Sequence, residues 1–449
     1  MRTTETKQPH IVVLGAGFGG LTFCQSFDHP TARVTLVDRQ NHHLFQPLLY
    51  QVAAAGLSAP EIAQPIRSIL APKSNVTVLL NEAVGVELAE RRVQLKDGTL
   101  DYDYLVVALG GATSYFGHPE WEKFAPGLKS LDDAMNIRQK ILLAFERAEN
   151  TTDPEEQARL MTIVVVGGGP TGVELAGAFA ELARHVLKPD FRRINTTRTR
   201  VVLIEGHDRL LSHLPPALSA SAAQQLTELG VEVRTSSRVQ NIREGCVELM
   251  PRAGETAGEV IQAENIIWAA GVSASSLTAS LGVDRDKAGR VKVNTDLSVP
   301  GHPEVFAIGD LALVMDKHGQ PVPGICPAAM QMGKHVAHVI RRELESEVPP
   351  ARAPFKYFDK GTMATIGRSA AVAKIGRLQF SGLLAWLAWL FVHLLFLIGF
   401  RNKAAVLLQW TYSYFTYKRG ARIVTRARPI QTASTRPLEV LSPTNPQRT

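Results

Sequence analysis

The 449-residue sequence has few cysteines, and they are poorly placed for joint chemistry. Cys24, Cys246 and Cys326 are odd in number and far apart, so they match neither a zinc site nor a disulfide framework. A reducing compartment is therefore expected, and no metal is implied, because no His/Cys cluster has ligand spacing. The N-terminus shows neither the apolar region nor the cleavage site of a signal peptide before its first apolar run at 11–14, so no secretion signal is expected.

Excess positive charge is also missing from most of the chain. The formal net charge is +7, but the residues from Arg401 onward include nine basic residues and only one acid, Glu439. That segment therefore carries +8, and residues 1–400 carry −1. A nucleic-acid-binding body needs a basic face on the fold itself, so nucleic acid is not expected as a partner.

Short apolar runs rich in β-branched residues alternate with helical patterns, which is typical of an α/β doubly wound fold. Helical patterns occupy 134–147 and 173–187. Two strand–glycine–helix units stand about 150 residues apart, so two Rossmann-like dinucleotide-binding domains are expected. Six runs are expected to form buried parallel strands, namely 11–14, 34–37, 104–108, 163–166, 201–204 and 266–269.

A glycine-rich turn directly follows the first of these strands and opens a helix. Gly15 would permit the tight turn, Gly17 would let the backbone approach a pyrophosphate, and Gly20 would let the helix pack closely on the strand. Gly19 belongs to the same motif. Asp38 ends the next strand, where a carboxylate accepts hydrogen bonds from an adenosine ribose. Strand, turn, helix and acid together predict a dinucleotide site.

The same arrangement recurs after the strand expected at 163–166. Glu205 ends the strand that follows the second motif. A carboxylate there suits a free ribose 2′-hydroxyl and repels a 2′-phosphate, so NADH is expected in preference to NADPH. Arg209 lies close enough in sequence to leave some use of NADPH open. The motif itself comprises Gly167, Gly169, Pro170, Thr171 and Gly172.

Two dinucleotide sites on one chain indicate a flavin and a nicotinamide that exchange a hydride. Ala108–Gly110 and Ala270–Gly271 resemble the strand-end motifs of two-dinucleotide flavoproteins. Gly309 and Asp310 resemble the motif whose aspartate contacts the ribityl chain of FAD. Reductases that use a redox cysteine pair are disfavoured, because Cys24 stands alone on the first helix, where a small buried residue is expected.

Four longer segments resemble the type II (non-electrogenic) NADH dehydrogenases, namely 41–53, 167–177, 360–368 and 399–402. The resemblance covers nearly the whole chain. It implies non-covalent FAD, oxidation of NADH, and reduction of a membrane quinone without proton pumping, by a ping-pong or ternary two-electron relay. A homodimer bound peripherally at the cytoplasmic face of the bacterial inner membrane is expected.

The resemblance also implies roles for individual residues. Phe45, Gln46 and Pro47 would line the isoalloxazine, and Arg39 would join Asp38 at the FAD site. Glu174 would sit between nicotinamide and flavin, where it would orient the nicotinamide or handle the quinol proton. Its alternative role is to complement the helix dipole.

One segment departs from the Ala-Gln-x-Ala-x-Gln motif common at the quinone pocket of this family. Residues 326–331 stand at that place, with Cys326 at an alanine position and Pro327 in place of the first glutamine. Proline has neither a side-chain amide nor a backbone N–H. Gln331 and Lys360 therefore become the expected quinone contacts. Lys360 would stabilise negative charge on the reduced flavin or quinone, and a solvated surface lysine is the alternative.

The C-terminal region combines apolar and basic stretches. Residues 378–400 contain no Asp, Glu, Lys or Arg, and one helix of that length would reach about 35 Å, against a hydrocarbon core of roughly 30 Å. The family pattern instead favours paired helices lying in one leaflet, with a spanning helix and a buried dimer interface as alternatives. Anionic lipid is expected to attract the basic residues that follow, Lys418, Arg419, Arg422, Arg426 and Arg428.

The expected organisation interleaves two domains. An FAD-binding part at 1–125 and its return part at 286–376, with the quinone-site residues, would enclose an NADH-binding domain at 126–285. Membrane-anchor helices at 377–428 and a disordered tail at 429–449 would follow. Two other functions stay open: a soluble flavoprotein reductase that passes electrons to ferredoxin or oxygen, and a non-catalytic nucleotide-binding redox sensor.

Overall fold

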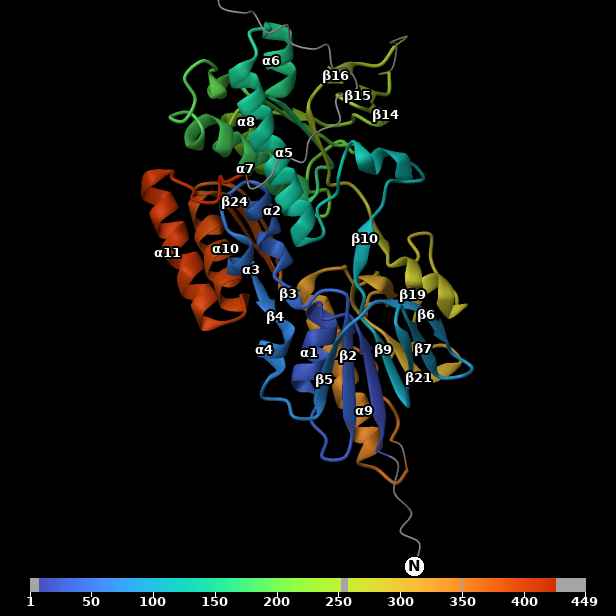
Figure 1. The fold of residues 1–449 in the computed structure, drawn as a ribbon. Helices are drawn as coiled ribbons and strands as arrows, with labels where there is room; N and C mark the ends of the chain where they lie inside the picture. The colour runs from blue at the N-terminus through green and yellow to red at the C-terminus, as the bar shows by residue number, and fades with distance from the viewer. Residues whose placement is uncertain (1–7, 252–256, 349, 425–449) are drawn as a thin grey trace, which may run out of the picture.

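The computed structural model describes residues 8–251, 257–348 and 350–424. Its larger sheet has the strand order β20-β21-β9-β1-β2-β5, and every pair except β20–β21 is parallel. Helices α1 (Phe18–Ser26) and α9 (Cys326–Leu344) cover one face of this sheet (Figure 1). The strands are β20 (Ser298–Val299), β21 (His302–Ala307), β9 (Tyr104–Val107), β1 (His10–Leu14), β2 (Arg33–Asp38) and β5 (Val76–Leu80).

A second parallel sheet has the order β13-β12-β11-β17 and lies at the other end of the molecule (Figure 1). Its strands are β13 (Val231–Arg234), β12 (Arg200–Ile204), β11 (Thr162–Val166) and β17 (Asn265–Trp268). Around it lie α5 (Leu131–Asn150), α6 (Pro154–Leu160), α7 (Pro170–Glu181), α8 (Pro216–Glu228) and the small sheet of β14 (Val239–Arg243), β15 (Cys246–Leu249) and β16 (Val260–Gln262).

The chain passes between the two sheets twice. Strands β10 (Gly111–Thr113) and β18 (Val272–Ala274) run antiparallel to each other at this passage. After β18 the chain returns to the first sheet, where β21 pairs with β9. The expected α/β fold with two Rossmann-like units is confirmed. All six expected strands lie in these sheets, because strands covered on both faces, such as the fully buried β1 and β11, need continuous apolar runs.

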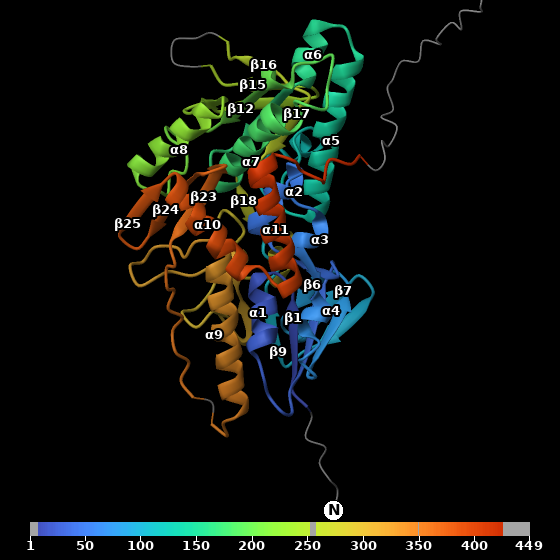
Figure 2. The same cartoon turned by 90° about the vertical axis from the view of Figure 1, so that its left-hand side faces the viewer.

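The segment after residue 360 forms a third unit. Strands β23 (Thr362–Gly367), β24 (Ala370–Ile375) and β25 (Leu378–Ser381) make an antiparallel sheet, followed by α10 (Leu383–Phe396) and α11 (Phe400–Thr416). The boundary expected between residues 376 and 377 falls inside the β24–β25 hairpin. Figures 1 and 2 show α10 and α11 side by side along one side of the molecule.

The apolar stretch 378–400 is therefore not one helix, and the alternative of a single spanning helix is excluded, whereas the expected pair of helices is present. Its first residues belong to β25, Gly382 begins α10 with φ +71°, and Gly399 with φ +85° separates α10 from α11. Glycine tolerates such positive φ angles, so both residues interrupt the helix at little cost. Within the described ranges, no helix has the length and apolar character needed to cross a membrane.

The chain after α11 contacts the second sheet's helices instead of leaving the protein. Arg419 pairs with Glu181 at the end of α7, with 2.9 Å between nitrogen and oxygen, and Arg422 pairs with Asp190. These two arginines, which the sequence led us to expect at the lipid surface, thus bind protein carboxylates in the structure. Lys418 stays exposed. Arg426, Arg428 and the tail at 429–449 lie outside the described residues.

The contact between α7 and β23 can be tested at Gly177. A Cβ at Gly177 would lie 1.7 Å from the carbonyl oxygen of Ile366, so alanine requires β23 to move away from α7. We expect Gly177→Ala to lower the midpoint of unfolding, at a cost of about 1–3 kcal/mol. Gly420→Ala is the control, because its Cβ would meet no atom within 4 Å. Equal unfolding midpoints for the two variants would contradict the close contact.

Candidate functional site

The turn between β1 and α1 leaves open space at only one of its key glycines. A Cβ at Gly15, whose φ is +97°, would lie 2.5 Å from the carbonyl oxygen of Ala108, and one at Gly20 would lie 1.9 Å from the oxygen of Gly15. Gly17 is the N-cap of α1, and its Cβ position has no atom within 4 Å. No side chain caps this helix. The free N–H groups of α1 therefore face a space that suits a phosphate group.

Asp38 and the Gly309 turn flank this space. The Asp38 carboxylate accepts hydrogen bonds from the backbone N–H of Ala16 at 2.6 Å and of Gln40 at 2.7 Å. A Cβ at Gly19 would lie 3.1 Å from the side chain of Ile308, directly before Gly309 and Asp310. The structure thus brings the expected FAD residues from three parts of the chain together. Arg39 is exposed beside Asp38, and Gly110 turns away from β9 with φ +68°.

The turn between β11 and α7 repeats this construction. Gly167 has φ +114°, and a Cβ there would lie 2.7 Å from the backbone nitrogen of Ala270, which precedes Gly271. A Cβ at Gly172 would lie 1.7 Å from the oxygen of Gly167, whereas the Cβ position of Gly169 is open. Gly169 is the N-cap of α7, again without a side-chain cap, and the exposed Pro170 and Thr171 follow it.

Glu205 stands at the end of β12, as Asp38 does at the end of β2. Its carboxylate accepts hydrogen bonds from the backbone N–H of Gly168 at 2.6 Å and of His207 at 2.7 Å. Burial opposes ionisation, but these bonds hold the pKa of Glu205 below its usual value. Arg209 donates to the carbonyl oxygen of Ser212 at 2.9 Å. The site therefore presents a negative charge where a 2′-phosphate would lie.

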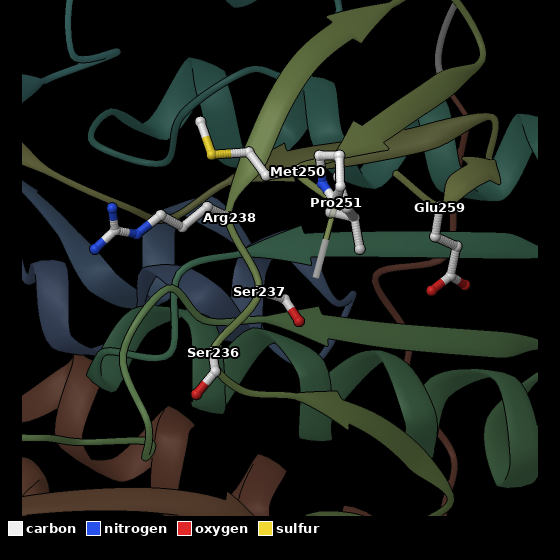
Figure 3. Close-up of a pocket in the computed structure, with 7 residues that line it drawn as sticks. Ser236, Ser237, Arg238, Met250, Pro251 and Glu259 are labelled. Atoms are coloured by element: carbon white, nitrogen blue, oxygen red, sulfur yellow. The ribbon is translucent and has the colours of Figure 1, made fainter. Parts of the chain in front are cut away.

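A pocket lies at the chain segment that follows β13 (Figure 3), and backbone hydrogen bonds connect this segment to Glu205 and His207. The backbone N–H of Ser236 donates to the oxygen of His207, and that of Ser237 donates to the oxygen of Glu205. The pocket could hold the adenosine end of a dinucleotide. Sequence patterns did not predict this pocket, because its only signal was a short polar run after β13. Its lining residues are Ser236, Ser237, Arg238, Leu249, Met250, Pro251 and Glu259.

Glu174 faces a different pocket, between α7, α10, α11 and the short helix α2 (Leu49–Ala53). It is the fifth residue of α7, beyond the first turn, so the helix-dipole alternative does not explain it. Burial raises the pKa of Glu174 to about 8, opposed by the backbone N–H of Thr365 and the indole of Trp389. Glu174 is therefore protonated at neutral pH and can act as a proton donor.

Phe45 connects the first glycine turn to the C-terminal helices. Its ring is nearly buried and makes edge contacts with Phe18 of α1 at 5.8 Å and with His393 of α10 at 6.3 Å. The exposed Gln46 donates to a backbone oxygen at 3.3 Å, and Pro47 follows in the same 3₁₀ turn. Phe45 thus lies between α1, at the expected flavin site, and α10.

Gln331 and Lys360 meet at the loop between α9 and β23. The Gln331 amide donates to the backbone oxygen of Phe358 at 3.0 Å and accepts from its N–H at 2.9 Å. Lys360 is exposed, with Nζ 5.1 Å from the ring centroid of Phe396 at the end of α10. Gln331 therefore holds the loop that carries Lys360, and Lys360 presents the more available donor.

The departures at 326–331 have structural causes. Pro327 is the second residue of α9, where a backbone N–H would have no intrahelical partner. Burial raises the pKa of Cys326 to about 12, and does the same for Cys24. Neither thiol is poised to react as a thiolate. Among the described residues, no group of three or more His, Cys, Asp or Glu side chains could hold a metal ion.

Comparisons with known proteins agree with this geometry. Residues 9–333 match the family described as pyridine nucleotide-disulphide oxidoreductase, and residues 360–418 match the NDH2 C-terminal domain. The chain is 44% identical to the type II NADH:quinone oxidoreductase Ndh of Mycobacterium tuberculosis, over 94% of this chain and 92% of that one. NdhA of the same organism is 42% identical, over 92% and 89%. NDH2 from Plasmodium falciparum in complex with NADH has a TM-score of 0.86 at 21% identity, over 94% and 100%.

The two open glycine positions allow a test that separates binding from folding. Gly17→Ala should leave the unfolding midpoint unchanged, because its φ of −66° suits alanine and its Cβ meets no protein atom. It should weaken FAD retention about tenfold or more, measured as flavin absorbance per protein, by filling the space for the pyrophosphate. Gly169→Ala is the matched variant and should retain FAD but raise the KM for NADH. Loss of FAD from both variants, or from neither, would contradict these assignments.

Proposed function

Because the chain belongs to the type II NADH:quinone oxidoreductases, a family of pyridine nucleotide-disulphide oxidoreductase fold, we propose that it transfers two electrons from NADH to a membrane quinone without pumping protons. The observation that carries this function is the 44% identity to a curated family member over 94% of the chain. It disfavours the soluble reductase and the redox sensor. FAD, held at the first glycine turn, would supply the two-electron redox chemistry that links NADH to the quinone.

The FAD site is proposed on the first glycine turn. The N–H groups at the start of α1 would bind the pyrophosphate beside Gly17, and Asp38 would accept hydrogen bonds from the adenosine ribose. Phe45 would bound the isoalloxazine on the side of α10. The other residues assigned to this site are Gly15, Gly19, Gly20, Arg39, Gln46, Pro47, Ala108, Gly110, Gly309 and Asp310.

The NADH site is proposed on the second turn. The start of α7 would bind the pyrophosphate beside Gly169, and the Glu205 carboxylate would accept hydrogen bonds from the ribose 2′-hydroxyl. The pocket at Ser236–Arg238 would take the adenosine. The further assigned residues are Gly167, Pro170, Thr171, Gly172, Ala270 and Gly271.

Glu174 is the proposed donor of the proton that quinone reduction needs in addition to the hydride of NADH. Reduction of a quinone by NADH consumes one proton from solution in addition to the hydride. Glu174 is protonated at neutral pH because of its burial, so it can give this proton to a quinone oxygen. Lys360, on its loop held by Gln331, would stabilise negative charge on the same oxygen.

Membrane attachment is proposed through the outer faces of α10 and α11. Large apolar side chains are exposed there, including Leu384 at 69%, Phe391 at 68% and Phe400 at 86%. A soluble surface rarely leaves so many apolar side chains exposed together. These helices would lie in one leaflet at the cytoplasmic face of the inner membrane. β25 is an edge strand with Leu378 exposed, and contact there with a second copy would form the proposed homodimer.

The proposed function predicts a specific effect of Glu174→Gln. NADH should still bleach the flavin of the variant, but its kcat with quinone should fall about 10²-fold, because the proton donor is lost. The wild-type kcat with quinone should decline as the pH rises through about 8, where Glu174 loses its proton. The variant should lack that decline. Failure of NADH to bleach the wild-type flavin would contradict the proposed enzyme, and an unchanged kcat in the variant would contradict the role of Glu174.

Charge placed on the outer helix face should detach the enzyme from lipid. We expect Leu384→Asp combined with Phe391→Asp to abolish sedimentation with vesicles containing anionic lipid, since a carboxylate resists transfer into the apolar layer. NADH oxidation with a water-soluble acceptor should survive. Val272→Asp is the matched control, because Val272 is 50% exposed but lies on β18, away from these helices. Equal sedimentation of the control and the double variant would contradict the proposed face.

A further inference from the structure

A directed chain of hydrogen bonds runs from α11 toward the pocket of Glu174. The indole N–H of Trp410 donates to Gln51 Oε1 at 2.8 Å, and Gln51 Nε2 donates to the hydroxyl oxygen of Tyr50 at 2.9 Å. An indole nitrogen can only donate. The oxygen of the Gln51 amide must therefore face Trp410, and its NH₂ group must face Tyr50. The direction of the chain is fixed by chemistry and does not depend on how the amide atoms are assigned.

This direction determines where the Tyr50 proton goes. The hydroxyl oxygen accepts from Gln51, so its own proton must point elsewhere. Tyr50 is 6% exposed and lines the same pocket as Glu174. Burial raises the pKa of Tyr50 well above its usual value, and the nearby Glu174 raises it further. In the described part of the chain, the Tyr50 hydroxyl accepts from Gln51 but donates no hydrogen bond to another protein group, so its proton is available to the pocket.

The charged groups around the pocket are already engaged with one another. The Glu181 carboxylate pairs with Arg419 at 2.9 Å and accepts the backbone N–H of Arg368 at 2.5 Å. The Arg368 guanidinium donates to backbone oxygens at the end of α11, and Arg419 also donates to the oxygen of Ala54 at 3.0 Å. The pocket's other titratable groups are the phenols of Tyr414 and Tyr417. Tyr50 is thus a donor whose orientation the protein fixes and whose proton has no acceptor outside the pocket. The indole N–H of Trp389, in the same pocket, also lacks a hydrogen-bond partner among the described residues, but no such chain of hydrogen bonds orients it.

We propose that Tyr50 is a positioning residue for Glu174, with Gln51 and Trp410 holding its hydroxyl so that the proton points toward the Glu174 carboxyl and reaches it through one water. When Glu174 protonates the quinone, its O–H bond breaks and an O–H bond forms on the quinone oxygen, while NADH supplies the two electrons. Tyr50 stabilises the carboxylate that remains and so makes the buried acid easier to deprotonate. This inference rests on the proposed role of Glu174.

The test compares pH profiles of holoenzyme variants with a short-chain, water-soluble quinone. Tyr50→Phe should lower kcat several-fold and move the alkaline decline upward by about one pH unit, because a hydrogen bond to the carboxylate is lost. Trp410→Phe should produce the same shift, because Gln51 can then turn its oxygen toward Tyr50 and take the phenolic proton. The double variant should shift no further than either single variant. Flavin reduction by NADH should be unchanged in all three.

Two matched substitutions serve as controls. Trp386 and Tyr414 line the same pocket, and their rings contact each other at 5.4 Å. Trp386→Phe and Tyr414→Phe should leave the pH of the decline unchanged. An unshifted profile in Tyr50→Phe or Trp410→Phe would overturn the inference, and so would an equal shift in the controls. If Glu174→Gln keeps the alkaline decline, the proposed role of Glu174 has failed, which is a distinct outcome from a failure of Tyr50 alone.

Discussion

Helix α7 joins the parts of this protein through contacts on its successive turns. Its first turn begins at Gly169, beside the space for a pyrophosphate. Glu174 follows in its pocket, and Gly177 meets the backbone of Ile366 at a distance that excludes any side chain. Glu181 then binds Arg419. Because one helix carries all four contacts, the second glycine turn, Glu174 and the C-terminal unit keep a fixed relative position.

The largely buried ion pair of Glu181 and Arg419 shows that part of the positive charge of the C-terminal segment stabilises a contact within the protein. Breaking a buried ion pair is costly, since it leaves one charge uncompensated, although the pair itself adds little net stability. The pair instead fixes the position of the chain after α11 relative to α7. Tyr417 supports the same arrangement, because its ring stacks on His185 while the Arg368 guanidinium lies 3.4 Å from its centroid. Part of the basic segment thus positions the chain within the folded protein, independently of any contact with lipid.

Local rules allowed much of the fold to be predicted from sequence. Strands such as β1 and β11 are buried on both faces, and the turns at Gly15 and Gly167 require positive φ, so both leave clear patterns. The same rules did not predict that the Gln331 amide would form hydrogen bonds with the backbone of Phe358, or that Arg419 would pair with Glu181. In both cases the two partners are distant in sequence. The composition of the apolar stretch at 378–400 could not by itself define its structure, for a similar reason. Its composition fits a spanning helix, while two glycines and the pairing of β25 with β24 decide its structure.

The two C-terminal helices each have an inner face that packs on the protein and an outer face that is exposed and apolar. On α10, Leu384, Phe391 and Leu395 are exposed, whereas Ala385 and Trp389 are buried. The buried face raises the pKa of Glu174 by excluding water, and Trp410 of α11 orients Tyr50 through Gln51. A quinone dissolves in lipid, whereas the proton it needs comes from water. An acid that donates to such a substrate must lie near the lipid and yet stay protonated. Burial by the same helices whose outer faces we propose as the membrane contact would satisfy both conditions.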